Sequence, residues 1–309
     1  MTNRRTFLTR FAMAAGAVSL LKPLDLFAGL GISKETASKS TLTLLHTANL
    51  KGQLAELEWG DKLNGLGGLV NIAKKIAAIK KESASVLAID TGNITASRSS
   101  EKATRLFYEK VSEAGYDIVI PGPTDLEKGI EHFEKVALES GLPTIPHNSQ
   151  SFNSGVLPYS VLKKGKIRIG IINAGTAILK GLHRTKPNQI ADLLNTTAYR
   201  LKTDEGCHVV ICLVQENEAV CIKLACLTCD IDVVVNSAEK SSVFNTQIIR
   251  NAANEEVILS YAGAKGVMLN RIDLTFNDQQ EKIFFASRVC LIGAPEEEFT
   301  ALIKQYKLL

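Results

Sequence analysis

The sequence predicts an α/β fold in which mixed β-sheets and flanking helices form layers. Short apolar runs such as 85–89 and 208–214, which fit strands buried on both faces, alternate with amphipathic segments of helical period such as 65–81. Several strand-like segments then follow one another after residue 243. Consecutive strands usually pair antiparallel, so we expect antiparallel as well as parallel neighbours in the sheets.

The elements of the first half follow from these periodicities. Strands are expected at 41–45, 85–89, 117–120 and 142–145, and helices at 65–81, 101–114 and 126–140. The helix at 65–81 is supported by Leu69, Ile72, Ile76 and Ile79, which fall on one face. The turn sequence Lys164-Gly165-Lys166 predicts a hairpin between strands at 159–163 and 167–172.

The second half repeats this style. Helices are expected at 188–203 and 216–226, and they alternate with strands at 208–214 and 231–235. Strands at 244–250, 257–261, 267–276 and 282–289 come next, and a helix over 295–306 closes the chain.

Length and charge limit the classes of protein. The 309 residues are 45% hydrophobic and 22% charged, enough for one large domain with a substantial core. The formal net charge is +4, and most of it comes from the arginines and the lysine of the first 30 residues. A partner held by bulk positive charge is therefore not indicated, and no nucleic-acid partner is expected.

The N-terminal segment MTNRRTFLTRFAMAAGAVSLL resembles a bacterial twin-arginine export signal. Arg4 and Arg5 precede a short apolar run that is too short for an ordinary membrane-spanning helix, so no transmembrane span beyond the signal is expected. The alternative is a disordered basic tail. The prediction divides the chain into a signal at 1–30, a linker at 31–40 and one domain at 41–309, located in the periplasm or cell envelope.

Five of the six cysteines lie between residues 207 and 229. Cys226 and Cys229 form a C-x-x-C, but no second such pair or nearby histidine completes a zinc set. We interpret the cysteines as small buried apolar residues, with a disulfide in the envelope as the alternative.

Polar loops follow five of the predicted strands, and such loops carry the functional residues of α/β proteins. They lie in the segments HTANLKG (46–52), LAIDTGNI (87–94), GYDIVIPGPTD (115–125), VVICLVQE (209–216) and IDVVVNSAEK (231–240). In order and spacing these segments resemble the metallophosphatase domain of the 5′-nucleotidase family, within the calcineurin-like phosphoesterases. GGLVNIAKKI and ILSYAGAKGVMLNRIDLTF are similar to further stretches of that family, and the resemblance covers about residues 40–278.

The resemblance implies the layered calcineurin-like metallophosphoesterase fold and two divalent metal ions that activate a water for attack on a phosphoryl group. Every position that it assigns to a metal ligand carries a different residue type here. These positions are Asn49, Lys51, Asn93, Pro123, Gln215, Ala238 and Lys240, and the family's catalytic histidine corresponds to Thr124. Such metals require carboxylates and neutral imidazoles, so we assign no catalytic residue and expect neither metal nor other cofactor.

We therefore expect an exported, catalytically inactive relative that acts as a binding or scaffolding module. Lys51 and Lys240 come from the first and last loops and should converge, so they are candidates for binding phosphate or nucleotide in place of metal. His46 and Asn148 are further candidate anion-binding residues. The alternative that both lysines point into solvent stays open.

The second hypothesis is an active phosphoesterase or 5′-nucleotidase with a rebuilt site. Its candidate residues are His46, Asp90, Asp125 and His147. His46 and Asp90 are otherwise interpreted as residues that support the first loop and orient the turn after their strand. The resemblance also makes a separate chain with the family's C-terminal, nucleoside-binding domain a candidate partner, because this sequence ends at Leu309.

Overall fold

The structure is a computed structural model of the whole chain, and it describes residues 39–58, 65–145, 156–181, 186–237 and 246–293. All of them belong to one compact unit, Lys39–Leu309. The predicted signal, nearly all of the predicted linker and the helix expected at 295–306 lie outside the described residues. No helix in the described ranges combines the length and apolar character needed to cross a membrane.

The first sheet has the strand order β11-β10-β1-β2-β3. Its strands are β1 (Ser40–Thr47), β2 (Val86–Asp90), β3 (Ile118–Val119), β10 (Met268–Phe276) and β11 (Lys282–Leu291). β1, β2 and β3 run parallel, and β10 and β11 add antiparallel neighbours on the other side of β1. This sheet is therefore mixed, as predicted.

The second sheet has the order β4-β5-β6-β7-β9-β8. Its strands are β4 (Tyr159–Lys164), β5 (Ile167–Ala174), β6 (Val209–Val214), β7 (Val233–Asn236), β8 (Gln247–Arg250) and β9 (Glu256–Tyr261). The four central strands are parallel, and β4 and β8 form antiparallel edges.

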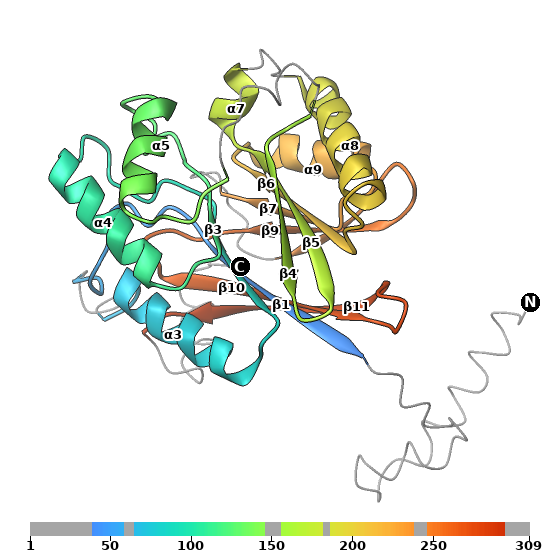
Figure 1. Cartoon of the computed structure of the whole chain (residues 1–309), viewed down its shortest axis with the longest axis horizontal. Helices are drawn as coiled ribbons and strands as arrows, with labels where there is room; N and C mark the ends of the chain where they lie inside the picture. The colour runs from blue at the N-terminus through green and yellow to red at the C-terminus, as the bar shows by residue number, and fades with distance from the viewer. Residues whose placement is uncertain (1–38, 59–64, 146–155, 182–185, 238–245, 294–309) are drawn as a thin grey trace, which may run out of the picture. The chain divides into compact units, whose positions relative to one another are not determined.

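The helices cover the outer faces of the two sheets (Figure 1). α3 (Leu69–Glu82), α4 (Glu101–Glu113) and α5 (Ile130–Glu139) share an apolar core with the first sheet. α7 (Thr176–Gly181), α8 (Pro187–Thr203) and α9 (Glu218–Leu227) lie on the second. A third apolar cluster, with Leu44 and Ile89 from one sheet and Ile171 and Leu213 from the other, fills the space between the sheets. The order of layers is thus helix, sheet, sheet, helix, which confirms the predicted fold class.

Two expected helices begin later than predicted, and one expected strand is almost absent. α3 begins at Leu69 rather than residue 65, because Gly67 and Gly68 have φ of 76° and 81°, outside the helical region. α5 begins at Ile130 because Gly129 has a φ of 92°. The strand expected at 142–145 is reduced to one isolated bridge between Thr144 and Val119. Pro143 lacks the backbone N–H that a longer ladder would need.

The six cysteines are free thiols. Cys207, Cys212, Cys221 and Cys290 are buried, as expected of small apolar residues, but Cys226 is exposed and Cys229 half-buried. The interpretation as core residues is therefore confirmed for four of them and wrong for the C-x-x-C pair. That pair lies where α9 ends at the surface.

Candidate functional site

The loops after β1, β2, β3, β6 and β7 meet at one edge of the molecule. Backbone hydrogen bonds join the first two, from Asn49 N to Gly92 O (2.8 Å) and from Lys51 N to Asn93 O (2.9 Å). The loops after β2 and β3 approach so closely that a Cβ on Gly122 would lie 2.3 Å from the backbone nitrogen of Asn93. Five segments that are distant in sequence therefore form one loop edge, which we define by Asn49, Asn93, Thr124, Gln215 and Ser237 and their loops.

Two asparagines at the centre of this loop edge are hydrogen-bonded to each other. Asn93 Nδ2 donates to Asn49 Oδ1 at 2.8 Å, and Asn49 Nδ2 donates to the carbonyl of Ser237 at 3.1 Å. Asn93 Oδ1 accepts from both the backbone N–H and the hydroxyl of Thr124, each at 3.1 Å. Asn49 and Asn93 are 2% and 4% exposed, so these bonds form a buried amide cluster.

Backbone geometry supports the choice of asparagine at these two positions. Asn49 and Asn93 have φ of 54° each, and Lys51 has a φ of 50°. This left-handed region is unfavourable for most residues with a side chain, but asparagine tolerates it well. The two loops therefore hold their amides in place by backbone conformation as well as by hydrogen bonds.

Gln215 joins the second sheet to the same cluster. Its Nε2 donates to the carbonyls of Thr91 (2.8 Å) and Pro121 (3.0 Å), and its Oε1 accepts from Thr176 N at 3.3 Å. The hydroxyl of Ser237 also donates to Thr91 O, at 2.9 Å. The Gln215 side chain thus links the loop after β6 to the backbone of the segments that follow β2, β3 and β5.

Two carboxyl groups of the loop edge, those of Asp90 and Asp125, are buried beneath it. Asp90 accepts from Thr47 Oγ1 (2.6 Å) and Gly92 N (2.9 Å), so it orients the turn after β2, as predicted. Burial raises the pKa of Asp90 to about 7, against the opposing effect of these hydrogen bonds. Asp125 accepts from the backbone N–H groups of Gly122, Ile94 and Thr95, and burial also raises its pKa.

His46 does not lie where an anion could reach it, so the expectation that it binds an anion is wrong. Its side chain is 0% exposed, and Nε2 forms a hydrogen bond of 2.8 Å with the hydroxyl of Ser260. Burial lowers the pKa of His46 to about 3, so the ring is neutral near pH 7. It supports the end of β1, which was the other interpretation of this residue.

The remaining predicted positions are distributed as follows. Lys51 is half-buried in the first loop and Pro123 is exposed in the third. The hydroxyl of Thr124, at the position that the resemblance assigns to the catalytic histidine, also lies 2.9 Å from Thr95 O, to which it can donate. Ala238, Lys240, Asn148 and His147 lie outside the described residues. The predicted convergence of Lys51 with Lys240 stays a prediction.

The structure also identifies participants that sequence analysis missed. Ser237 contributes both its carbonyl and its hydroxyl to the amide cluster. Lys265, in the loop after β9, donates its backbone N–H to Asn49 O at 2.8 Å, so a second lysine belongs to the first loop's surroundings. Lys265 lies in the segment AGAKG, whose resemblance to the family was visible but whose lysine carried no signal by itself.

The donor set at the loop edge does not fit two divalent metal ions. Such ions need charged oxygen ligands or neutral imidazoles, and the described positions that the resemblance assigns to metal ligands supply neutral amides, a proline and a lysine. The amide oxygens of Asn49, Asn93 and Gln215 already accept hydrogen bonds. Among the described residues, no group of three or more histidine, cysteine, aspartate or glutamate side chains could hold a metal.

The fold and the five convergent loops define a protein with metallophosphoesterase architecture and an amide-lined loop edge. The 5′-nucleotidase precursor from Thermus thermophilus is similar over 87% of this chain and 60% of its own, with a TM-score of 0.65 and 17% identity. The NAD nucleotidase (NadN) of Haemophilus influenzae matches 88% of this chain and 56% of its own, with a TM-score of 0.66 and 14% identity. The calcineurin-like phosphoesterase YfkN of Bacillus subtilis is covered over 97% of its chain, with a TM-score of 0.58 and 14% identity.

At these identities the likeness establishes the fold, and it confirms the fold that the sequence resemblance implied. The chain matches only 60% and 56% of the length of the first two structures, so their activities are not transferred with the fold. Neither a protein-family model nor a curated protein matches the sequence.

Proposed function

We propose that this chain is a non-hydrolytic relative of the metallophosphoesterases whose loop edge binds an anion such as phosphate or a nucleotide. The observation that carries this proposal is the 2.8 Å hydrogen bond between Asn93 and Asn49, at two positions that the resemblance assigns to metal ligands. Neutral amides that satisfy one another hold the loops together without a cation between them.

Hydrolysis would need a group that activates water and charges that stabilise the transition state. Asp90 and Asp125, the two carboxyl groups considered for a rebuilt site, are 0% and 7% exposed, and both are bound to backbone N–H groups. His46, the third described member of the rebuilt site considered above, is 0% exposed. These positions favour binding over turnover.

Anion binding is favoured by the charges around the first loop. Lys51 follows the buried Asn49 and Leu50, and the backbone of Lys265 is bonded to Asn49 O. Lys51 and Lys265 therefore lie on segments joined by a backbone hydrogen bond, and lysine donates charge-assisted hydrogen bonds to an oxyanion. The buried carboxyl group of Asp90, whose pKa is raised to about 7, is partly protonated near pH 7, which reduces repulsion of a bound anion.

The experiment combines metal analysis, turnover and binding on the same preparation. The protein is purified with added manganese and zinc, its metal content is measured by elemental mass spectrometry, and hydrolysis of a generic phosphoester is assayed. Binding of inorganic phosphate and AMP is measured by isothermal titration calorimetry. Lys51→Met and Lys265→Met are compared with Lys74→Met, which removes the same charge from an exposed position on α3.

We expect no stoichiometric metal, no turnover, and anion binding that weakens about tenfold or more in Lys51→Met or Lys265→Met but not in Lys74→Met. About two metals per chain together with turnover would overturn the proposal in favour of an active phosphoesterase. Absence of phosphate and AMP binding, or equal weakening in all three variants, would overturn the anion-binding part.

Export by the twin-arginine route and a location in the periplasm or envelope are part of this proposal. The support is the sequence pattern around Arg4 and Arg5. Replacement of both arginines by lysine should retain the protein in the cytoplasm, as cell fractionation would show. Unchanged export of that variant would contradict the assignment.

A further inference from the structure

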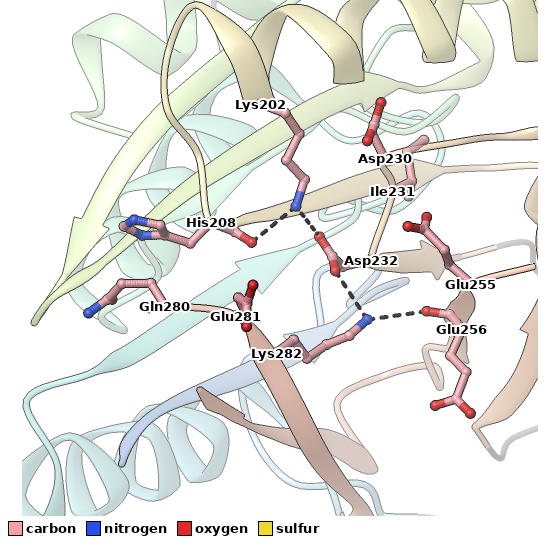
Figure 2. Close-up of a pocket in the computed structure, with 10 residues that line it drawn as sticks. All are labelled: Lys202, His208, Asp230, Ile231, Asp232, Glu255, Glu256, Gln280, Glu281 and Lys282. Carbon is pink, nitrogen blue, oxygen red and sulfur yellow. Dashed lines mark hydrogen bonds and ion pairs between the residues drawn. The ribbon is translucent and has the colours of Figure 1, made fainter. Parts of the chain in front are cut away.

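A polar pocket lies at the opposite ends of the strands from the loop edge. It has a volume of about 440 Å³ and is formed where β6, β7 and β9 begin, by the end of α8 and by the turn between β10 and β11 (Figure 2). Its lining residues are Lys202, His208, Asp230, Ile231, Asp232, Glu255, Glu256, Gln280, Glu281 and Lys282. None of these residues takes part in the amide cluster, so this distal pocket is a separate feature.

One partly buried carboxylate, that of Asp232, organises the distal pocket. Lys202 Nζ donates to Asp232 Oδ2 at 2.9 Å, and Lys282 Nζ reaches Asp232 Oδ1 at 3.1 Å, so that the two lysines approach Asp232 from opposite sides (Figure 2). The ammonium groups also donate to the carbonyls of His208 (3.0 Å) and Glu256 (3.2 Å). Burial alone would raise the pKa of Asp232, but Lys202 and Lys282 hold it below its ordinary value. The positive charges of the pocket are thus directed at acceptors that the protein supplies.

The other carboxylates of the distal pocket retain acceptor oxygens. Glu255 and Glu281 each accept one side-chain amide hydrogen bond on Oε2, from Asn251 (3.2 Å) and Asn277 (2.8 Å). Among the described residues, no hydrogen bond to Oε1 of either glutamate is seen, so this oxygen can accept from a donor in the cavity. Glu256 is ion-paired to Arg250 at 2.8 Å, which leaves four carboxylates facing two ammonium groups around the pocket, an excess of two negative charges.

Two neutral groups complete the lining. The amide oxygen of Gln280 is buried and accepts no hydrogen bond from the described residues. Leaving such an acceptor without a donor costs about 1–3 kcal/mol, so a ligand that donates a hydrogen bond there would be stabilised. His208 Nδ1 accepts from Arg168 N at 2.9 Å, which places the ring hydrogen of the neutral imidazole on Nε2.

The arrangement of these acceptors selects the kind of cation. A compact divalent ion needs several ligands around one point, and no described group of three or more acidic, histidine or cysteine side chains is gathered closely enough to hold one. The acceptors are instead spread over three segments of the wall, from Asp230 to Glu281, and Ile231 adds an apolar surface. This pattern suits an extended ligand with several N–H donors spaced along an aliphatic chain.

We propose that the distal pocket binds a linear aliphatic polyamine. Its ammonium groups would bind Glu255, Glu281 and Asp230, and its methylene chain would lie against Ile231 and the lysine stems. A volume of about 440 Å³ falls within the range of small-molecule sites. The site is independent of the anion-binding loop edge, so failure of one proposal leaves the other untouched.

The test measures spermidine binding to the full chain by isothermal titration calorimetry at moderate salt. The double variant Glu255→Gln/Glu281→Gln removes two wall carboxylates while keeping hydrogen-bonding groups. Glu109→Gln and Glu101→Gln together provide the control, because they remove the same charge from exposed positions on α4. Thermal unfolding checks that all variants are folded, and n-butylamine serves as a ligand with a single charge.

We expect one spermidine per chain, with affinity at least about tenfold weaker in the double variant and unchanged in the control. Butylamine should bind at least about tenfold more weakly than spermidine. The proposal is overturned by absence of spermidine binding, or by equal weakening in the control, which would indicate diffuse electrostatic attraction. Tighter binding of trilysine than of spermidine, with the same sensitivity to the double variant, would overturn it in favour of a protein partner.

Discussion

The Asp90→Asn variant should change the pH dependence of stability in a way that isolates one buried carboxyl group. Asp90 is 0% exposed, and its pKa is raised by burial from 3.8 to about 7. In the folded chain the carboxyl is therefore mostly protonated between these values, whereas in the unfolded chain it is ionised. The stability that this difference contributes is fully present below about pH 4, declines as the pH rises to about 7, and is constant above.

The magnitude follows from the interval between the two pKa values. About three pH units at about 1.4 kcal/mol each correspond to about 4 kcal/mol of unfolding free energy. The substitution is sterically mild: the asparagine oxygen can still accept from Gly92 N, and its NH₂ can donate to Thr47 Oγ1. The Thr47 hydroxyl can then donate to Tyr116 Oη, which lies 2.7 Å away.

The assay is urea unfolding, followed by circular dichroism, over about pH 4 to 8 for wild type and Asp90→Asn. The quantity to plot is the difference in unfolding free energy, because His46 acts in the opposite sense. The pKa of His46 falls to about 3 on burial, so its contribution to stability is present above about pH 6.5 and is lost as the pH falls toward 3.

The difference, wild type minus variant, should decrease by about 4 kcal/mol as the pH rises from about 4 to 7. The control is Asp278→Asn, a substitution at an exposed position in the turn between β10 and β11. A difference that is flat or that increases with pH for Asp90→Asn would refute the assignment of a buried, protonated carboxyl beneath the loop edge.

Three further predictions concern the stability of the amide cluster at the loop edge and of the distal pocket. Asn93→Ala should lower the unfolding free energy by about 3–5 kcal/mol, because it leaves buried hydrogen-bond partners unsatisfied and places alanine at a φ of 54°. Asn254→Ala, at an exposed position with a φ of 62°, should lower it by only about 1 kcal/mol. Similar losses for the two variants in urea unfolding would contradict the amide cluster. Gly122→Ala should lower stability by at least about 2 kcal/mol, because its Cβ would lie 2.3 Å from a backbone nitrogen, and an unchanged melting temperature would disprove this close approach. Asp232→Asn should lower the unfolding free energy by about 3–5 kcal/mol near pH 7, because Lys202 and Lys282 lose their shared carboxylate. This loss should shrink as the pH falls below about 4, where the wild-type carboxylate is protonated. A loss that is independent of pH would argue against the ion pairs.

The loops themselves could be located from the sequence because each follows an apolar strand and ends in a turn. The 46–52 and 87–94 segments combine a buried strand with asparagine and glycine, residues that tolerate positive φ. The replacement of ligand types was equally visible, because carboxylate and imidazole are chemical properties of single residues. The unexpected short helix α7 was not visible, since its six residues are too few for a periodic pattern.

The sequence alone determined the layered α/β class, most strands and helices, and the chemistry of the former ligand positions, because periodicity and residue type are local properties. Tertiary structure decided which groups meet. The bond between Asn93 and Asn49 joins residues 44 positions apart, and the bond from Gln215 to Thr91 spans 124 positions. It also buried His46 completely, and it gathered Lys202, Asp232 and Lys282 around one pocket. Such contacts depend on how strands from distant segments pair and pack, which no local pattern in the sequence specifies.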